Sequence, residues 1–178
     1  FNRGWKFRWD RDQRRVSGVI LMQTSSDKAY LRTVLAMESF RDMGVPSFFA
    51  FPVRLQQNGA FHSVMHLVER GDDDFLQRNG LATDGALYKV YDYLTNAYAG
   101  VAEKKTLQNE DNSDLQALIA GVNLTGPARR QFIYDNIDVP EFINFLATSQ
   151  AVQNEDCCDK NYYLYRDSAG TGEWQMLP

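Results

Sequence analysis

The sequence predicts an α+β fold in two lobes, a strand-rich N-lobe with one helix over residues 1–69 and a mostly helical C-lobe over residues 70–178. Three observations support this prediction. Alternating apolar and polar residues dominate the first lobe, apart from one segment with helical spacing. A glycine followed by three acidic residues at positions 71–74 predicts a hinge that leads into a helix. Segments with helical spacing then prevail until a final pair of short strands.

Length and composition allow one domain or two small lobes and exclude several classes of partner. The chain has 178 residues, of which 44% are hydrophobic and 13% aromatic, enough for a proper core. Its net charge of −4 gives no reason to expect nucleic acid or an anionic membrane as a partner. No apolar run approaches the roughly 20 residues of a membrane span, and no leader segment is visible. We therefore expect a piece of a longer protein that encodes neither an anchor nor a targeting signal.

The two cysteines, Cys157 and Cys158, are adjacent in the sequence. A disulfide between neighbouring residues is strained and rare, so we do not expect one. Zinc is not expected either, because adjacent thiols lack the two-to-four-residue spacing of zinc ligands and both histidines lie far away in the sequence.

The N-lobe begins with two predicted strands. Large and charged residues alternate from Trp5 to Trp9, which places Lys6 and Arg8 on one face of the first strand. This strand therefore offers a cationic face. A polar run follows, and Val16 to Gln23 is typical of a second strand.

A helix is predicted next, from Lys28 to Met43, after four residues that can cap it. Gly44 and Pro46 end it. Its apolar positions fall at helical spacing and predict a buried stripe: Leu31, Val34, Leu35 and Met37. Glu38 lies on or beside this stripe, so its carboxylate needs a cationic partner or must reach the rim.

The segment from Ser47 to Glu69 contains the clearest local signal. Asn58 and Gly59 separate two strand-like runs, and this pair is typical of a β-hairpin turn. In the C-lobe the same reasoning predicts a strand, a polar loop at 109–114, three helices and a closing hairpin. Their ranges are Gly85–Val90 for the strand, Asp114–Val122, Pro127–Ile133 and Val139–Ser149 for the helices, and Tyr162–Tyr165 with Glu173–Pro178 for the hairpin. Three residues form the apolar face expected to pack the third helix into the lobe: Phe142, Phe145 and Leu146.

Asp156 stands five residues before Asn161, just ahead of an aromatic strand. This is the catalytic-loop spacing of protein kinases, in which the Asp accepts the proton of the attacking hydroxyl and the Asn binds a magnesium ion. Asp and Asn are also common in loops, so a solvated turn before a strand is the alternative interpretation. The order of the elements, with a strand-rich lobe, a hinge and a helical lobe before this loop, is that of a two-lobed kinase.

The sequence also resembles the CotH kinase family, named for spore coat protein H, over nearly its whole length. The matching segments are Trp5–Arg8, Asp27–Arg32, Arg41–Pro46, Asn58–Gly59, Leu67–Glu69, Asp74–Leu76, Gly85–Lys89 and Lys160–Tyr165. The resemblance implies an atypical protein-kinase-like fold that binds ATP and Mg²⁺ or Mn²⁺ and phosphorylates proteins, with spore coat proteins as the known substrate class. It also suggests a spore coat, cell-surface or secreted location.

Carried over to this sequence, the resemblance implies that Asp156 is the catalytic residue and that Asn161 binds the metal. Lys160 helps to neutralise phosphate charge on this interpretation, and a solvated lysine beside a carboxylate is the alternative. At the adenine edge, we expect Val68 and Glu69 to contact the base through backbone groups rather than side chains.

The nucleotide-binding lysine is less well defined by the sequence. Lys6 is our prediction, with Arg8 on the same face and Glu38 as its carboxylate partner, by analogy with the lysine and helix-glutamate pair of kinases. Arg32 is an alternative charged residue for this role, and a solvent-exposed position is the alternative for Glu38.

Two features depart from the kinase pattern. No glycine-rich loop precedes Lys6, and the chain stops at Pro178, where the family continues into a Trp-Asp-x-Asp segment whose carboxylate should bind metal. We therefore expect residues 1–178 alone, as a partial CotH kinase-like domain truncated at its C-terminus, to have little or no kinase activity. A non-catalytic spore-coat or cell-surface interaction module on a kinase-like scaffold is the alternative function.

Overall fold

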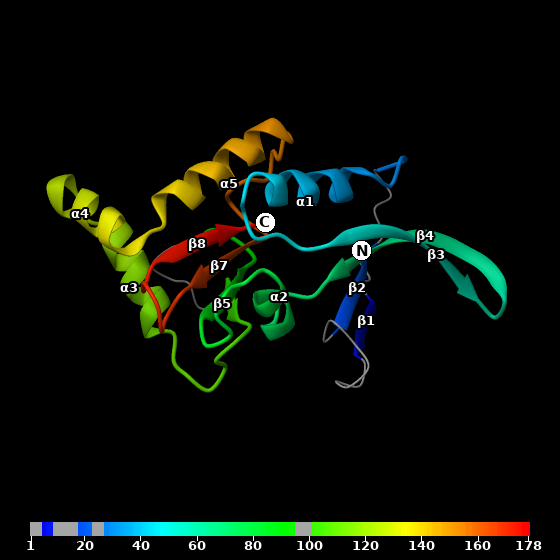
Figure 1. The fold of residues 1–178 in the computed structure, drawn as a ribbon, viewed down its shortest axis with the longest axis horizontal. Coiled ribbons are helices and arrows are strands. Elements are labelled where there is room, and N and C mark those ends of the chain that lie inside the picture. The colour runs from blue at the N-terminus through cyan, green and yellow to red at the C-terminus, as the bar shows by residue number, and fades with distance from the viewer. Residues whose placement is uncertain (1–4, 9–17, 23–26, 95–100) are drawn as a thin grey trace.

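The computed structural model of the chain describes residues 5–8, 18–22, 27–94 and 101–178. Within these ranges it is an α+β structure with two four-stranded antiparallel sheets and five helices (Figure 1). The predicted fold class is therefore confirmed at this level. None of the described helices combines the length and the apolar composition that a membrane crossing needs.

The first sheet is built from the N-terminal half of the chain. Its strand order is β1 (Trp5–Arg8), β2 (Gly18–Met22), β4 (Ala60–Glu69) and β3 (Ala50–Gln57). The predicted hairpin turn is confirmed, because Asn58 and Gly59 both adopt the positive φ angles, 53° and 80°, that this turn requires. The β3–β4 hairpin extends well beyond the rest of the molecule (Figure 1).

Helix α1 (Arg32–Asp42) begins four residues later than the sequence predicted. The carboxylate of Asp27 accepts hydrogen bonds from the backbone N–H groups of Ala29 (3.2 Å) and Arg32 (2.8 Å), so a capped turn precedes the helix. The predicted buried stripe is wrong for its N-terminal half, because Leu35 is 57% exposed there. Only the C-terminal end of the helix is fully covered. There α1 lies beside helix α5 (Val139–Ala151) (Figure 1), and Phe40 stacks on Phe145 of that helix at 5.3 Å between ring centroids.

The second sheet follows the predicted hinge, since β4 ends at Glu69 and the next helix is capped by Asp72. Its strand order is β6 (Ala102–Lys104), β5 (Ala86–Val90), β7 (Tyr162–Arg166) and β8 (Trp174–Leu177). The sequence did not predict β6. The helices of this half are α2 (Asp73–Arg78), α3 (Ser113–Val122), α4 (Gly126–Asn136) and α5 (Val139–Ala151). On α5, Phe145 is buried as predicted, whereas Leu146 is 47% exposed, because Leu146 lies on the outer side of the helix.

Two clusters of buried side chains hold the structure together. The larger cluster packs Phe40 of α1 against the second sheet and against α3 and α5. The smaller cluster joins the two sheets, because it contains Val68 of β4, Leu177 of β8 and the stacked rings of Phe48 and Phe75, which lie 4.2 Å apart. Both clusters therefore include residues from either side of position 70.

Candidate functional site

Two adjoining cavities open between the sheets and α1. The first, here called the hinge cavity, has a volume of about 510 Å³ and is lined by Ile20, Val68, Glu69, Lys89, Asn161 and Tyr163, among others. The second, the loop cavity, measures about 1130 Å³ and is lined by residues of α1 and of the loop from Gln153 to Asn161. Asn161 lines both, so it lies where the two cavities meet.

The hinge cavity has apolar and aromatic walls. Ile20 and Val68 of the first sheet line one side, and Tyr163 of the second sheet lines another. The ring of Tyr163 packs on the ring of Phe48, with 4.9 Å between the two centroids. Gly71 lies so close to this wall that a Cβ atom there would stand 2.7 Å from Cε1 of Tyr163. The walls can therefore hold a flat, apolar group between two sheets.

Glu69, at the back of this cavity, is fully engaged by protein groups. Its carboxylate accepts a 2.7 Å hydrogen bond from Nε of Arg78 and a second bond from Nη2 of the same guanidinium. That guanidinium also donates to the carbonyl oxygen of Ser47 (2.6 Å). Burial raises the pKa of Glu69, and the Arg78 hydrogen bonds oppose that rise. The Glu69 side chain is thus occupied in holding α2 against the first sheet, and its backbone N–H donates to the carbonyl oxygen of Phe49 (3.0 Å).

The structure adds to the hinge cavity a cation, Lys89, for which the sequence suggested no role. Lys89 stands opposite Tyr163 in the β5–β7 register, and its Nζ lies 4.4 Å from the centroid of that ring. Burial, with a smaller effect of the Lys105 charge, lowers the pKa of Lys89 to about 8. The sequence signal for such a role was that Lys89 is the one charged residue in the strand Ala86–Val90. The other four residues of that strand are apolar or aromatic, and they are buried in the structure.

Five of the six residues of the predicted catalytic loop at 156–161 line the loop cavity, and they include the three with expected roles. Nζ of Lys160 lies 3.5 Å from Oδ1 of Asp156, and the Asp156 side chain is 69% exposed. Asn161 adopts a φ of 60°, a left-handed conformation that Asn tolerates better than most residues. Asp156, Lys160 and Asn161 therefore border one cavity, and Asp156 is open to a large partner.

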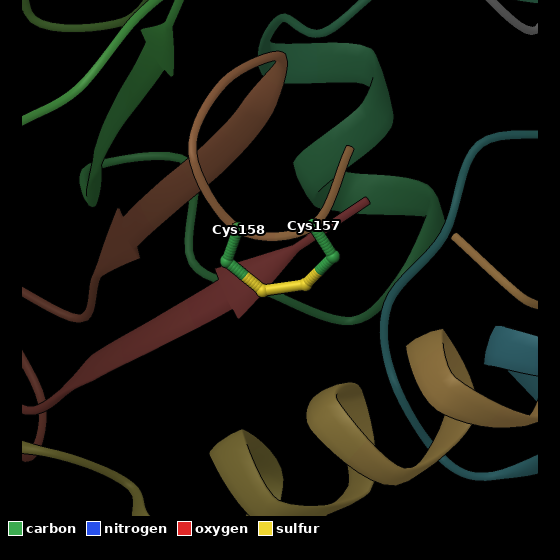
Figure 2. The surroundings of a disulfide bond; sticks show 2 residues. All are labelled: Cys157 and Cys158. Atoms are coloured by element: carbon green, nitrogen blue, oxygen red, sulfur yellow. A yellow bond between two sulfur atoms is a disulfide. The ribbon is translucent and has the colours of Figure 1, made fainter. Parts of the chain in front are cut away.

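Cys157 and Cys158 form a disulfide in the structure, so the expectation that they would not bridge is wrong (Figure 2). The loop turns between Asn154 and Lys160 in a way that brings both side chains to the same side. Both cysteines pack against the larger core cluster. The disulfide thus lies directly between Asp156 and Asn161 in the chain, at the inner side of the loop.

The remaining predicted site residues lie elsewhere or outside the described part. Glu38 is 52% exposed and pairs with Arg41 at 3.8 Å, and it lines neither cavity. The backbone of Lys6 pairs with Ile20 in the β1–β2 register, but the side chains of Lys6 and Arg8 lie outside what the structure describes. Arg32 lines the loop cavity. In the described ranges, no group of three or more His, Cys, Asp or Glu side chains could hold a metal ion.

Comparison with known proteins identifies the family. The sequence profile of the CotH kinase protein family matches residues 3–178. The chain is also 28% identical to the inner spore coat protein H of Bacillus subtilis (strain 168), in an alignment that covers 85% of this chain and 45% of that protein. The chain therefore spans less than half the length of this relative. Because the family match covers almost every residue, the chain belongs to the CotH kinase protein family.

Proposed function

We propose that this chain forms the nucleotide-binding and catalytic region of an ATP-dependent protein kinase of the CotH type. The observation that supports this proposal best is the position of Asn161, where the hinge cavity meets the loop cavity. Asp156 and Lys160 also line the loop cavity. A kinase needs such an arrangement, because the nucleotide must present its last phosphate to a hydroxyl beside the catalytic base.

The base of the nucleotide occupies the hinge cavity in this proposal. Ile20 and Val68 cover one face of the adenine and Tyr163 borders it from the second sheet, while the first sheet and the second sheet correspond to the N-lobe and C-lobe of a kinase. Arg78 holds the Glu69 carboxylate, and the backbone of Val68 and the N–H of Glu69 pair within the first sheet, so the contact of this strand with the base comes from the Val68 side chain in place of the expected backbone groups. The phosphates then extend toward Asn161 and Lys160.

A divalent metal fits the chemistry of the residues that border the loop cavity. Asn161 and Asp156 both carry hard oxygen donors, which Mg²⁺ and Mn²⁺ prefer, and phosphate oxygens and water complete such sites in kinases. The bound ion would neutralise charge on the phosphates. Lys6, which pairs with Ile20 in register, remains our candidate for the nucleotide-binding lysine, with Arg8 beside it. A Glu38 partner for Lys6 requires the pair between Glu38 and Arg41 to open.

Asp156 provides the proton acceptor in this mechanism. As the hydroxyl oxygen of the substrate forms its bond to the γ-phosphorus of ATP, the bond from that phosphorus to the bridging oxygen breaks, ADP leaves with the electron pair, and the hydroxyl proton passes to a carboxylate oxygen of Asp156. Lys160, 3.5 Å from Asp156, stabilises the negative charge that builds up near the transferred phosphoryl group. The exposure of Asp156 suits a protein substrate, whose hydroxyl side chain must enter from solvent.

The relative suggests where the protein acts. Because that protein is described as an inner spore coat protein, we propose spore coat or surface proteins as substrates and the spore coat as the location. These assignments belong to the whole protein, of which the chain spans part.

A phosphoryl-transfer assay tests the proposal. The protein, with whatever sequence follows residue 178 in the natural gene, is incubated with radiolabelled ATP, Mg²⁺ or Mn²⁺ and spore coat extract. We expect Asp156→Asn to lose transfer at least a hundredfold. The matched control is Asp159→Asn, because Asp159 belongs to the same loop but lines neither cavity. Equal activity of the Asp156 variant and the wild type would overturn the proposed role.

A non-catalytic interaction module is the second candidate function. The β3–β4 hairpin supports it, because this extended element carries the exposed rings of Phe51 and Phe61. Thermal stabilisation by ATP with Mg²⁺ or Mn²⁺ distinguishes the two candidates. A kinase shows a rise in Tm that Asn161→Ala reduces, whereas no rise in the wild type favours the interaction module.

A further inference from the structure

We propose that Lys89 contacts the bound nucleotide and binds its phosphate chain within the hinge cavity. This inference rests on the proposed function, because it requires the hinge cavity to hold a nucleotide. It adds a cation that comes from β5, in the second sheet, whereas Lys6 belongs to the first sheet.

The first argument is the charge balance of the cavity wall. The other charged groups near Lys89 already have partners: Glu69 is bonded to Arg78, and Lys105 pairs with Glu103 at 2.6 Å. Arg70 lies 3.9 Å from Asp72. Among the residues that the structure describes, Lys89 makes no ion pair, and its one specific contact is the face of Tyr163. The cavity thus has an uncompensated cation whose natural counter-ion is an anionic ligand.

The second argument is the position of Lys89 beside the aromatic wall. The ammonium lies over the ring of Tyr163, at 4.4 Å from its centroid, beside the space that we assign to the base, and its strand is paired on both sides, with β6 and β7. A ligand with a flat apolar part and an anionic part would satisfy both groups at once. Asn161 lines the same cavity, so phosphates that reach toward it remain within this enclosed space.

The lowered pKa of Lys89, about 8, supports the same conclusion. Burial and the nearby Lys105 charge disfavour the charged ammonium, and a bound phosphate would favour it. Nucleotide binding near pH 8 should therefore be accompanied by proton uptake. Because part of the Lys89 side chains is neutral at that pH, binding takes up protons there, and the contribution of Lys89 shrinks as the pH falls below its pKa.

Calorimetric titration with ATP, AMP and adenosine tests the proposal. We expect Lys89→Met to weaken ATP binding at least tenfold, AMP binding less, and adenosine binding hardly at all. Lys89→Arg should retain most of the ATP affinity but lose the proton uptake, because Arg stays protonated at pH 8. The uptake is measured by repeating the ATP titration in buffers of different ionisation enthalpy.

Two control variants accompany these measurements. Lys28→Met removes an exposed lysine outside both cavities and should bind all three ligands as the wild type does. Lys105→Met should weaken ATP binding less than Lys89→Met does, because Lys105 already has a carboxylate partner. A Tm close to that of the wild type shows that each variant is folded, and the Arg variant keeps the test usable if the Met variant does not fold.

The outcomes separate this inference from the proposed function. If the wild type binds ATP and Lys89→Met binds it equally well, the inference is wrong while the proposed function stands. An equal loss for ATP and adenosine also overturns it, since Lys89 would then contact the base or ribose. If the wild type binds no nucleotide, the proposed function fails and the inference with it.

Discussion

The hinge cavity and the loop cavity share Asn161 but are built in different ways. Strands of both sheets form the hinge cavity, and its charged groups are buried or half-buried and mostly paired, as the bonds between Glu69 and Arg78 show. A loop and one face of α1 form the loop cavity, where Asp156 is 69% exposed. Strand walls hold a ligand in one geometry, whereas an open loop admits a large partner. The comparison predicts that changes in the hinge cavity affect stability and nucleotide binding, and that changes in the loop affect turnover.

The largest expected effect concerns the loop cavity. Asp156→Ala should reduce phosphoryl transfer by a factor of about 10² to 10⁴, because it removes the residue that we propose as proton acceptor. Its Tm and its affinity for ATP without metal should stay close to the wild-type values, since the exposed side chain contributes only one weak ion pair. Activity assays, thermal melts and calorimetry measure the three quantities. A large fall in the Tm of this variant would contradict the prediction that changes in the loop affect turnover and leave stability unchanged.

The second effect concerns the wall of the hinge cavity. Arg78→Met should lower the free energy of unfolding by about 3 kcal/mol, because it leaves the carboxylate of Glu69 buried without its cation. Urea denaturation measures this loss. The double variant Arg78→Met with Glu69→Gln should recover part of the stability, since no buried charge remains. A change below 0.5 kcal/mol for the single variant would mean that this pair does not hold the wall.

The third effect is a pH dependence of stability at β8, the last strand of the second sheet. Burial, with a smaller effect of Asp138, raises the pKa of Glu141 to about 8, although the carboxylate accepts a 2.9 Å bond from the Met176 N–H. The unfolded chain loses this proton near 4.5 and the folded chain near 8. Stability is therefore highest below pH 4.5 as far as this group is concerned, and it falls as pH rises toward 8.

Glu141→Gln tests this pH dependence. The variant should be more stable than the wild type at pH 8, by several degrees in Tm, and its Tm should vary less between pH 5 and 8. The variant Glu173→Gln, at a half-buried position in the turn before β8, is the matched control and should follow the wild type. Parallel Tm profiles for the wild type and the Glu141 variant would contradict the assignment.

The smallest effect concerns Glu38. Because its side chain is half exposed and pairs only with Arg41 among the described residues, Glu38→Gln should change the free energy of unfolding by less than about 0.5 kcal/mol. The same variant tests the proposed pairing with Lys6. A fall in ATP affinity without a fall in stability would favour that pairing, and unchanged affinity would count against it.

Local sequence patterns were sufficient for most of the secondary structure. The Asn58–Gly59 turn, the cap at Asp72 and the helix that begins at Val139 all depend on residues close in sequence, and all were predicted. The strand β6 was missed because its three residues carry too little pattern. The stripe on α1 was mispredicted because burial depends on what a helix faces, and the N-terminal half of α1 faces a cavity instead of a core.

The sequence by itself determined the family and the order of the loop residues, since Asp156, Lys160 and Asn161 come from one short segment whose spacing carries the signal. Only the tertiary structure decided which distant residues meet this loop. Lys89 and Tyr163 face the same cavity because β5 and β7 pair in one register, and Glu69 is neutralised by Arg78 because α2 packs beside β4. Such contacts depend on how strands pair and helices pack, and these arrangements leave no fixed spacing in the chain.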